Sequence, residues 1–437
     1  MPSQNPPGVF VTELPSGVRT ITGASTSVPA FLGYTKASAN DDPSAAPEPF
    51  TDAERVVPQK IRSWQEFAAR YSVQGIAKEL ADATEPAAIH TLQRCLPLAE
   101  AVYGFFANGG STCYVVGFTS PQSAVSPEEL KGNTDARTGL AALETVPEVT
   151  MVAVPSLWDM TADASAEKEA PTPDHAEGVG RMAQVVKHCT EQRNRLAILD
   201  PPPGLTPAEA AAFADTLGSR DSDDAAFTAL YYPWITVPGV DAVERTVPPC
   251  GHVAGVWART DAERGVFKAP ANQNLRGALK LQTVLTDDQH GELNAKGVNC
   301  LRLFPDRGLL VWGARTRSTT RDWRYLNVRR LVSYLADSVH QSSTWAVFEP
   351  NDERLWATLR HSVSSFLTDQ WRQGALVGRT PDEAFYVICD DTNNTPKTID
   401  DGKVICDIGV APVRPAEFVH FTITQIAGQS GEAPKAT

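Results

Sequence analysis

The chain has 437 residues, 42% of them hydrophobic and 21% charged, which is enough for two or three domains with a substantial core. Its net charge of −13 argues against a nucleic-acid partner. The apolar runs are strand-sized, and the N-terminal residues lack the pattern of a signal peptide, so we expect cytoplasmic synthesis and no membrane insertion.

The first predicted element is a short strand over Gly8–Leu14, which lies between two turn-forming segments rich in proline and glycine. A polar tract over Val18–Ser27 separates it from the apolar run Val28–Gly33. An isolated strand cannot bury itself, so we expect this segment to be an arm that pairs with a strand elsewhere.

Helices and strands then alternate through the middle of the chain. The expected helices are Trp64–Tyr71, Leu96–Asn108, Gly180–Gln192 and Pro207–Leu217, and the expected strands are Thr112–Gly117, Val149–Pro155, Arg195–Leu199 and Phe227–Tyr232. Thr206 is the expected N-cap of the fourth helix. This alternation predicts an α/β domain with a mostly parallel sheet, and the polar stretch Trp158–Glu177 predicts an exposed excursion.

The last third of the chain has a different pattern. After a strand at Leu309–Trp312, two amphipathic helices are expected at Asp322–His340 and Asp352–Gln373. Strands are expected at Ala384–Cys389, Val404–Val410 and Glu417–Ile426. The last of these lies close to the C-terminus and is a second candidate arm.

Positive charge is concentrated in one segment, Arg302–Arg330. It contains eight arginines and two aspartates, a net +6, so the rest of the chain carries −19. Such a contrast gives one molecule a basic face and an acidic face, which is an electrostatic basis for ordered self-assembly or for docking an acidic partner.

No reaction signature is recognisable in the sequence. It has no Walker A motif, no G-x-S-x-G elbow, no H-E-x-x-H and no G-x-G-x-x-G after a strand. His188 and Cys189 are adjacent in a predicted helix and therefore point apart. The pairs Asp390–Asp391 and Asp400–Asp401 are better explained as solvated loop residues than as a metal site. We expect no catalytic site, no metal and no cofactor.

The seven cysteines are scattered, odd in number and never spaced C-x-x-C, which argues against a disulfide framework and a zinc site. We expect reduced, mostly buried thiols. They are Cys95, Cys113, Cys189, Cys250, Cys300, Cys389 and Cys406.

Four runs between Tyr231 and Leu331 carry a resemblance to a known family. They are YYPWI (Tyr231–Ile235), VPPCGHVAGVWARTDAERGVFKAPAN (Val247–Asn272), LFPDRGLLVWGARTRS (Leu303–Ser318) and WRYLNVRRL (Trp323–Leu331). Together with PGVFVTE at Pro7–Glu13 and RPAEFVHFTITQ at Arg414–Gln425, they closely resemble the tail sheath proteins of contractile phage tails and phage-tail-like injection systems.

The resemblance implies a structural protein rather than an enzyme. Family members stack as hexameric rings around an inner tube above a baseplate, and the passage from an extended to a contracted sheath drives the tube through a target envelope. The partners it implies are other copies of the chain, the tube protein, and baseplate and cap proteins. The particle would assemble in the bacterial cytoplasm and be part of a phage tail or a related, possibly released, device.

The resemblance also implies a domain division. Residues 1–27 would be an N-terminal arm and linker, and residues 28–275 an outer α/β domain with an exposed insertion around 120–180. Residues 276–412 would be an inner, tube-facing α+β domain, and residues 413–437 a C-terminal arm and tail. Arm strands exchanged between subunits would complete the inner sheet, and the connector Pro15–Ser27 could reach about 40 Å at about 3.3 Å per residue.

Two sets of residues are expected at subunit contacts. The residues expected to exchange strands are Val9, Phe10, Val11, Thr12, Phe418, Val419, His420, Phe421, Thr422 and Ile423. The arginines expected to meet the tube or a neighbouring subunit are Arg315, Arg317, Arg321, Arg324, Arg329 and Arg330. Two rival interpretations are an α/β enzyme with an unrecognised site and a non-contractile tube or baseplate component.

Overall fold

A nine-stranded sheet forms the centre of the molecule, with strand order β2-β3-β1-β4-β5-β6-β11-β12-β9. The computed structural model describes residues 20–35, 50–71, 73–119, 125–158 and 175–418. The strands are β1 (Pro29–Tyr34), β2 (Gln59–Ile61), β3 (Cys113–Phe118), β4 (Met151–Ala153), β5 (Leu196–Leu199), β6 (Thr228–Tyr232), β9 (Gln273–Asn274), β11 (Val298–Phe304) and β12 (Gly308–Val311).

The sheet is mixed, with a parallel centre. Strands β3, β1, β4, β5, β6 and β11 pair in parallel, whereas β2 pairs antiparallel at one end, and β12 and β9 pair antiparallel at the other. Every residue of β1 and β3 is buried, which is typical of parallel strands covered on both faces. The predicted α/β class with a largely parallel sheet is confirmed.

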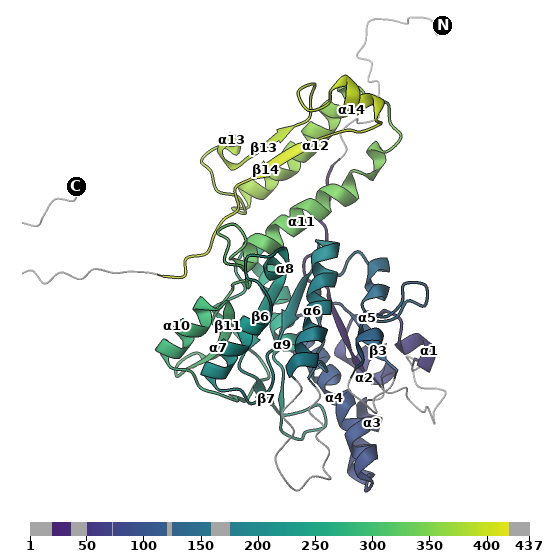
Figure 1. The fold of residues 1–437 in the computed structure, drawn as a ribbon, viewed down its shortest axis with the longest axis vertical. Helices are drawn as coiled ribbons and strands as arrows, with labels where there is room; N and C mark the ends of the chain where they lie inside the picture. Colours follow the sequence, from purple (N-terminus) through teal and green to yellow (C-terminus); the bar gives the residue numbers. More distant parts are fainter. Residues whose placement is uncertain (1–19, 36–49, 72, 120–124, 159–174, 419–437) are drawn as a thin grey trace, which may run out of the picture.

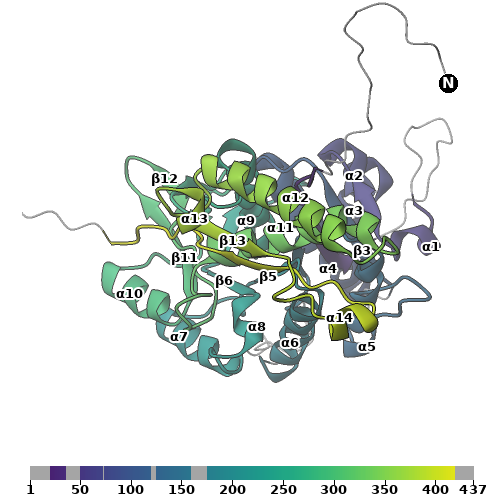
Figure 2. The ribbon, with the colours of Figure 1, turned by 90° about the horizontal axis from the view of Figure 1, so that it is seen from above.

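Helices cover both faces of the sheet. They are α1 (Asp52–Arg55), α2 (Trp64–Arg70), α3 (Val73–Asp82), α4 (Pro86–Ala107), α5 (Pro127–Lys131), α6 (His175–Gln192), α7 (Pro207–Thr216), α8 (Asp223–Ala226), α9 (Cys250–Arg264) and α10 (Asp287–Ala295). Figure 2 shows α4 and α9 on one side of the sheet, and α6, α7 and α10 on the other. The expected N-cap of α7 is confirmed, because Thr206 and Glu209 form a capping box.

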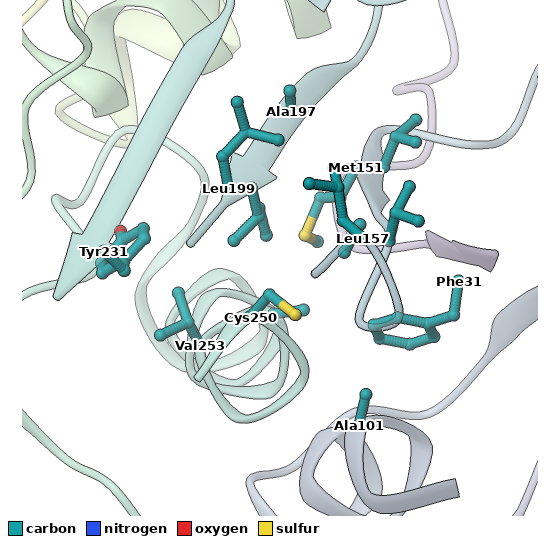
Figure 3. Close-up of a cluster of buried hydrophobic side chains, with 14 of the residues drawn as sticks. Phe31, Ala101, Met151, Leu157, Ala197, Leu199, Tyr231, Cys250 and Val253 are labelled. Atoms are coloured by element: carbon teal, nitrogen blue, oxygen red, sulfur yellow. The ribbon is translucent and has the colours of Figure 1, made fainter. Parts of the chain in front are cut away.

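Helix α9 was not expected from the sequence, although it lies within one of the family-like runs. It is buried on nearly all sides, so it has no polar face and no amphipathic period. Its glycines allow close packing on α4: a Cβ on Gly251 would lie 2.3 Å from Ala101 Cα, and one on Gly255 would lie 2.5 Å from the Phe105 carbonyl oxygen. Figure 3 shows α9 facing the strands through its buried side chains.

The C-terminal part of the chain forms a separate layer at one end of the sheet body (Figure 1). This layer, called the C-terminal layer below, contains α11 (Leu326–Ser342), α12 (Glu353–Arg372), α13 (Pro381–Ala384), β13 (Phe385–Ile388), α14 (Pro396–Asp400) and β14 (Asp407–Val410). Its core is distinct from that of the sheet body and is built around Leu331, Val363 and Leu367. The predicted helix pair and the strands β13 and β14 are confirmed.

Helix α11 begins later than predicted. The sequence indicated a start at Asp322, but the structure begins the helix at Leu326. Tyr325 forms an antiparallel bridge with Arg315, and the Arg324 carbonyl accepts a hydrogen bond from Thr316 N at 2.9 Å. This extended pairing prevents the residues before Leu326 from adopting a helical conformation.

The predicted boundary at residues 275 and 276 does not separate two folding units. Strands β11 and β12, which follow it, pair with β6 and β9 in the central sheet. A small sheet joins β10 (Lys280–Leu281), β7 (Ile235–Val237) and β8 (Arg245–Val247) across the same boundary. The change of layer comes instead at α11, where the chain leaves the sheet body after β12.

Candidate assembly surfaces

The β13–β14 sheet is the surface best suited to accept another strand. Phe385, Val387 and Val410 pack against the core of the C-terminal layer. The alternate residues of β13 point outward, with Tyr386 57% exposed and Ile388 39% exposed. One face is therefore anchored to the helices, while the other presents apolar side chains to solvent.

Among the described residues, β13 and β14 pair only with each other. Each strand therefore has an outer edge without a neighbouring strand in the described part of the chain. Two strands are marginal as an independent sheet, and an unpaired edge is a template for a further strand.

The segment after the N-terminal arm is bound along α11. Thr22 N donates to Ser342 Oγ at 3.1 Å, and Ala24 N donates to Ser338 Oγ at 2.9 Å. A Cβ on Gly23 would lie 2.4 Å from the Tyr334 hydroxyl, so this segment lies directly against the helix. The connector Pro15–Ser27 cannot extend over its full predicted length in this conformation, because these contacts hold its second half against α11.

The C-terminal segment is also held by the subunit, up to residue 418, where the described part of the chain ends. Val413 N donates to the Ala375 carbonyl at 3.1 Å. Arg315 binds Glu417 through two guanidinium nitrogens, with Nε at 2.8 Å from Oε1. Hydrogen bonding to Glu417 raises the pKa of Arg315. Arg315, predicted to contact a tube or neighbour, therefore holds the root of the C-terminal arm in this structure.

The strand-exchange residues themselves lie almost entirely outside the described residues. Val9–Thr12 and Val419–Ile423 are in this group. Phe418 is described and its side chain is 69% exposed. The strand-exchange expectation for both arms stays a prediction.

A buried ion pair joins the sheet body to the C-terminal layer. Arg330 of α11 binds Asp261 of α9 at 2.9 and 2.5 Å, and both side chains are 3% exposed. The Arg330 guanidinium lies 4.7 Å from the Trp257 ring centroid and also donates to the Thr26 carbonyl at 2.9 Å. This group, called the joint below, links the two layers and the N-terminal segment at one point.

A second polar residue of α11 supports the joint. Asn327 Nδ2 donates to the Phe267 carbonyl at 2.7 Å and to the Val413 carbonyl at 3.0 Å. The sequence analysis did not select Asn327 or Asp261. For Asn327, the available signal was its position on the apolar side of a predicted helix, because a polar side chain needs a hydrogen-bond partner when it is buried.

Three of the six selected arginines are buried inside the subunit. The prediction that they contact the tube or a neighbouring subunit is therefore wrong for these three. Besides Arg330, these are Arg317 and Arg329, which are 2% and 7% exposed. Arg317 donates to the carbonyls of Leu217 and Ala214 at 2.7 Å and so caps the C-terminus of α7. The physical reason is that long arginine side chains can satisfy carbonyls deep in the structure.

Arg329 is held by aromatic rings. Its guanidinium lies 4.1 Å from the Trp323 ring centroid and 4.8 Å from that of Phe227. Burial, together with the nearby charge of Arg193, lowers the pKa of Arg329 to about 10, so the side chain stays protonated at pH 7. The exposed members of the set are Arg321 and Arg324, which alone remain open to a partner in this conformation.

The residues considered for chemistry are placed in structural roles. His188 Nε2 lies 3.3 Å from Arg195 Nη1, and burial lowers the pKa of His188 to about 4. Asp390 accepts from Thr392 in a turn. Within the described ranges no group of three or more His, Cys, Asp or Glu side chains could hold a metal ion. No helix in those ranges combines the length and apolar content needed to cross a membrane.

A cavity of about 340 Å³ lies where an α/β enzyme would bind its ligand. It is at the carboxyl ends of β1 and β4, where the strand order reverses, and is lined largely by Tyr34, Leu96, Pro97, Trp158, Trp234 and Val247. Two of its charged lining residues, Arg245 and Asp241, are paired, and Arg245 binds both Asp241 and Glu100 at 2.6 Å. This arrangement gives the enzyme interpretation no support.

Asp200, just after β5, is the most perturbed carboxyl group in this region. Burial raises the pKa of Asp200 to about 7, and hydrogen bonds from the thiol and backbone N–H of Cys250 oppose that rise. Cys250 is the first residue of α9, so Asp200 lies at the positive end of the helix dipole. This carboxyl is therefore buried beside the N-terminus of a buried helix.

Comparison with known proteins is consistent with this architecture. The family model described as "Phage tail sheath protein central domain" matches residues 131–317, and "Phage tail sheath C-terminal domain" matches residues 318–426. The junction between them lies just before α11. Together the two models match more than half of the chain.

One similar curated protein is a putative prophage major tail sheath protein from Pseudomonas aeruginosa strain UCBPP-PA14. It is 25% identical over 252 residues, which are 55% of this chain and 61% of that protein. The chain thus spans less than two thirds of this relative's length.

Two solved structures match nearly the whole chain. A chain in the anti-feeding prophage baseplate is 28% identical, with a TM-score of 0.70 over 97% of this chain and 100% of that one. A chain of the PVC sheath complex, an extracellular contractile injection system in its contracted state, is 26% identical, with a TM-score of 0.65 over 97% and 99%. With both domain models matched in order along one chain, this protein belongs to the phage tail sheath family.

Proposed function

We propose that this chain is a structural subunit that polymerises as stacked hexameric rings around an inner tube. Passage from an extended to a contracted state would drive the tube through a target envelope. Similarity to a contracted sheath over 97% of the chain supports this proposal. The protein acts by assembly and not as an enzyme, and its synthesis and assembly take place in the bacterial cytoplasm.

The observation that carries the proposal is the incomplete β13–β14 sheet. Its outward apolar side chains and unpaired edges fit an arriving strand, which would supply backbone hydrogen bonds and cover Tyr386 and Ile388. Residues Val9–Thr12 and Phe418–Ile423 would be these strands, donated by neighbouring subunits. An added strand of about six residues makes about four to six hydrogen bonds, each worth about 1 kcal/mol net.

The bound roots of both arms support a connection that survives movement. Residues 22–26 lie along α11, and Glu417 is held by Arg315, so each arm leaves its own subunit from a fixed point. Rings could then shift relative to one another while the exchanged strands stay paired. The free energy of contraction would come from new contacts between sheet bodies.

The exposed arginines Arg321 and Arg324 are proposed to contact acidic groups on the tube or on a neighbouring subunit. Solvent-accessible ion pairs are weak, at about 0–1 kcal/mol each, and can be released when the sheath moves. The other partners would be baseplate and cap proteins. The proposal involves no nucleic acid, cofactor or direct membrane insertion.

Negative-stain microscopy of the purified full-length chain tests the proposal. We expect cylinders or stacked rings from the unmodified protein. Deletion of Pro2–Glu13 should leave a folded subunit that sediments as a monomer, because the neighbour's sheet is no longer completed. Uniform single particles from the unmodified chain, under conditions that include a tube protein, would support a rival function instead.

A matched pair of charge reversals tests the arginine contacts. Arg324→Glu should impair assembly around the tube while leaving the monomer's circular dichroism spectrum unchanged. Arg354→Glu is the control. It reverses the charge of another exposed arginine, which lies in the C-terminal layer, and the variant should assemble normally. Equal assembly of the two variants would remove Arg324 from the proposed contact.

A further inference from the structure

Two cysteines stand opposite each other at the open end of the β13–β14 sheet. The last pair in the antiparallel register is Ile388 with Asp407. Cys389 directly follows β13 and Cys406 directly precedes β14, so they occupy the next opposed positions. Directly opposed residues in antiparallel strands have Cα atoms about 4.5–5.5 Å apart. A disulfide needs about 4.4–6.8 Å, so this register meets the backbone requirement.

The side chains of the two cysteines meet. Cys389 is a buried member of an apolar cluster with Leu355 and Trp356, and Cys406 packs against the same cluster. Residues that are opposed in antiparallel strands place their side chains on the same face, so the two thiols lie together on the helix-facing side. They are in the reduced form in this structure.

The backbone around the pair is fixed on both sides. Arg360 Nη1 donates to the Cys389 carbonyl at 2.8 Å. Asn394 Nδ2 donates to the Ile405 carbonyl at 2.9 Å, and Ile405 N donates to Asn394 Oδ1 at 2.7 Å. These bonds hold the residues next to each cysteine, so the two sulfurs are kept close without a covalent bond.

The pair differs from the other cysteines in reactivity. The hydrogen bond from Cys406 lowers the pKa of Cys389, and the charge of Arg360 acts in the same direction. Burial instead raises the pKa of Cys189 and Cys300 to about 12. Cys406 is partly exposed, whereas the five cysteines of the sheet body are all buried. A thiolate is the attacking species in disulfide exchange, so the pair is the favoured site.

We propose that Cys389 and Cys406 form an intrachain disulfide when the protein meets a small-molecule disulfide, and that this bond locks the β13–β14 sheet. The oxidant is a compound such as oxidised glutathione. The proposed consequence for arm binding rests on the function proposed above, whereas the formation of the bond does not.

The reaction balances as two thiol–disulfide exchanges. Cys406 first transfers its proton to the Cys389 thiolate, and the accessible Cys406 sulfur then attacks the small disulfide, which forms a mixed disulfide and releases one glutathione thiolate. The Cys389 thiol loses its proton to that thiolate or to solvent and attacks the Cys406 sulfur, which releases the second glutathione. The protein loses two hydrogens, and the small disulfide is reduced to two thiols.

The expected structural effect is on the sheet that would receive the arms. The bond would close the loop containing α14 and fix the register at the end where β13 and β14 diverge. Disulfides form and persist in oxidising surroundings and are rare in the cytosol. The sheet would therefore stiffen after the particle leaves a reducing compartment.

Mass spectrometry of the full-length chain tests the bond directly. After reduction, removal of the reductant and incubation with oxidised glutathione, we expect a mass loss of about 2 Da and a peptide joining Cys389 to Cys406. The variant Cys389→Ser should instead retain one glutathione on Cys406, because no second thiol is there to displace it. Cys189→Ser is the matched control and should cross-link like the unmodified chain.

Three results would overturn the inference: a chain that stays fully reduced, a stable glutathione adduct on the unmodified chain, or cross-links between subunits. A separate experiment measures thermal unfolding. Oxidation should raise the unfolding temperature of the unmodified chain and not that of Cys406→Ser. If the bond forms but no cylinders are seen by microscopy in either redox state, the proposed function fails and the disulfide stands.

Discussion

The two sheets of this molecule differ in how completely one chain can satisfy them. The central sheet has nine strands, and β1 and β3 are buried at every position. The β13–β14 sheet has two strands, and no residue of either is buried. The first is stabilised by helices of its own subunit on both faces, whereas the second has helices on one face only.

The difference indicates that the two parts of the subunit have different functions. The strands at the centre of the sheet body bury their side chains within the chain. The C-terminal layer keeps its helices packed but leaves a sheet edge open. The joint at Arg330 and Asp261 is a buried ionic contact that crosses from α9 to α11 and ties the two parts together.

The largest expected loss comes from breaking the joint. Arg330→Ala removes the partner of a buried carboxylate and should lower the free energy of unfolding by about 3–5 kcal/mol. Urea denaturation followed by circular dichroism measures this. Arg321→Ala, at an exposed position, is the control and should change stability by less than about 0.5 kcal/mol. Similar losses for both would mean that the pair does not connect the layers.

A core truncation in the central sheet should cost nearly as much. Leu32 is fully buried in β1, so Leu32→Ala should destabilise the protein by about 2–5 kcal/mol through lost burial and a residual cavity. The same kind of truncation at half-exposed Ile408 should cost less than about 1 kcal/mol. If the two midpoints in urea shift equally, the contrast between the sheets is wrong.

Asp200 predicts a pH dependence that belongs to the sheet body. Its folded pKa of about 7 lies above its ordinary value of 3.8, so the folded protein binds the proton more tightly than the unfolded chain. Stability is therefore greatest below pH 4 for this group and falls as the pH rises to about 7, by up to about 1.4 kcal/mol per unit.

Asp200→Asn should flatten that slope. Unfolding measured at pH 5, 6, 7 and 8 should show a smaller decline in the variant than in the unmodified protein. Asp215→Asn, at a half-exposed carboxyl, is the comparison and should keep the original slope. A variant with an unchanged slope would show that Asp200 does not ionise in this range.

The smallest effect on stability should accompany the largest effect on assembly. Ile388→Lys places a charge on the open face of β13 and should change the free energy of unfolding by less than about 0.5 kcal/mol. We expect the variant to remain monomeric in sedimentation experiments, because an incoming strand would have to bury the ammonium group. Normal cylinders from this variant would exclude that face as the acceptor.

The sequence alone determined the local elements with strong periodicity and clear end signals. Thr206 was predicted as the cap of α7, and the amphipathic helix α12 was predicted to within one residue at each end. The run of alternating strands and helices also predicted the parallel sheet, and the family-like runs predicted the sheath fold. These features depend on residues that are close in the chain.

Only the tertiary structure decided where the polar groups of the last third lie. Arginines that are close in the sequence differ in burial. Arg324 is exposed, while Arg329 and Arg330 are buried, because Phe227, Trp257 and Asp261 approach them from distant segments. Helix α9 was missed for a related reason. A helix buried on all sides has no period to read, and only its close packing on α4 through Gly251 and Gly255 explains its composition.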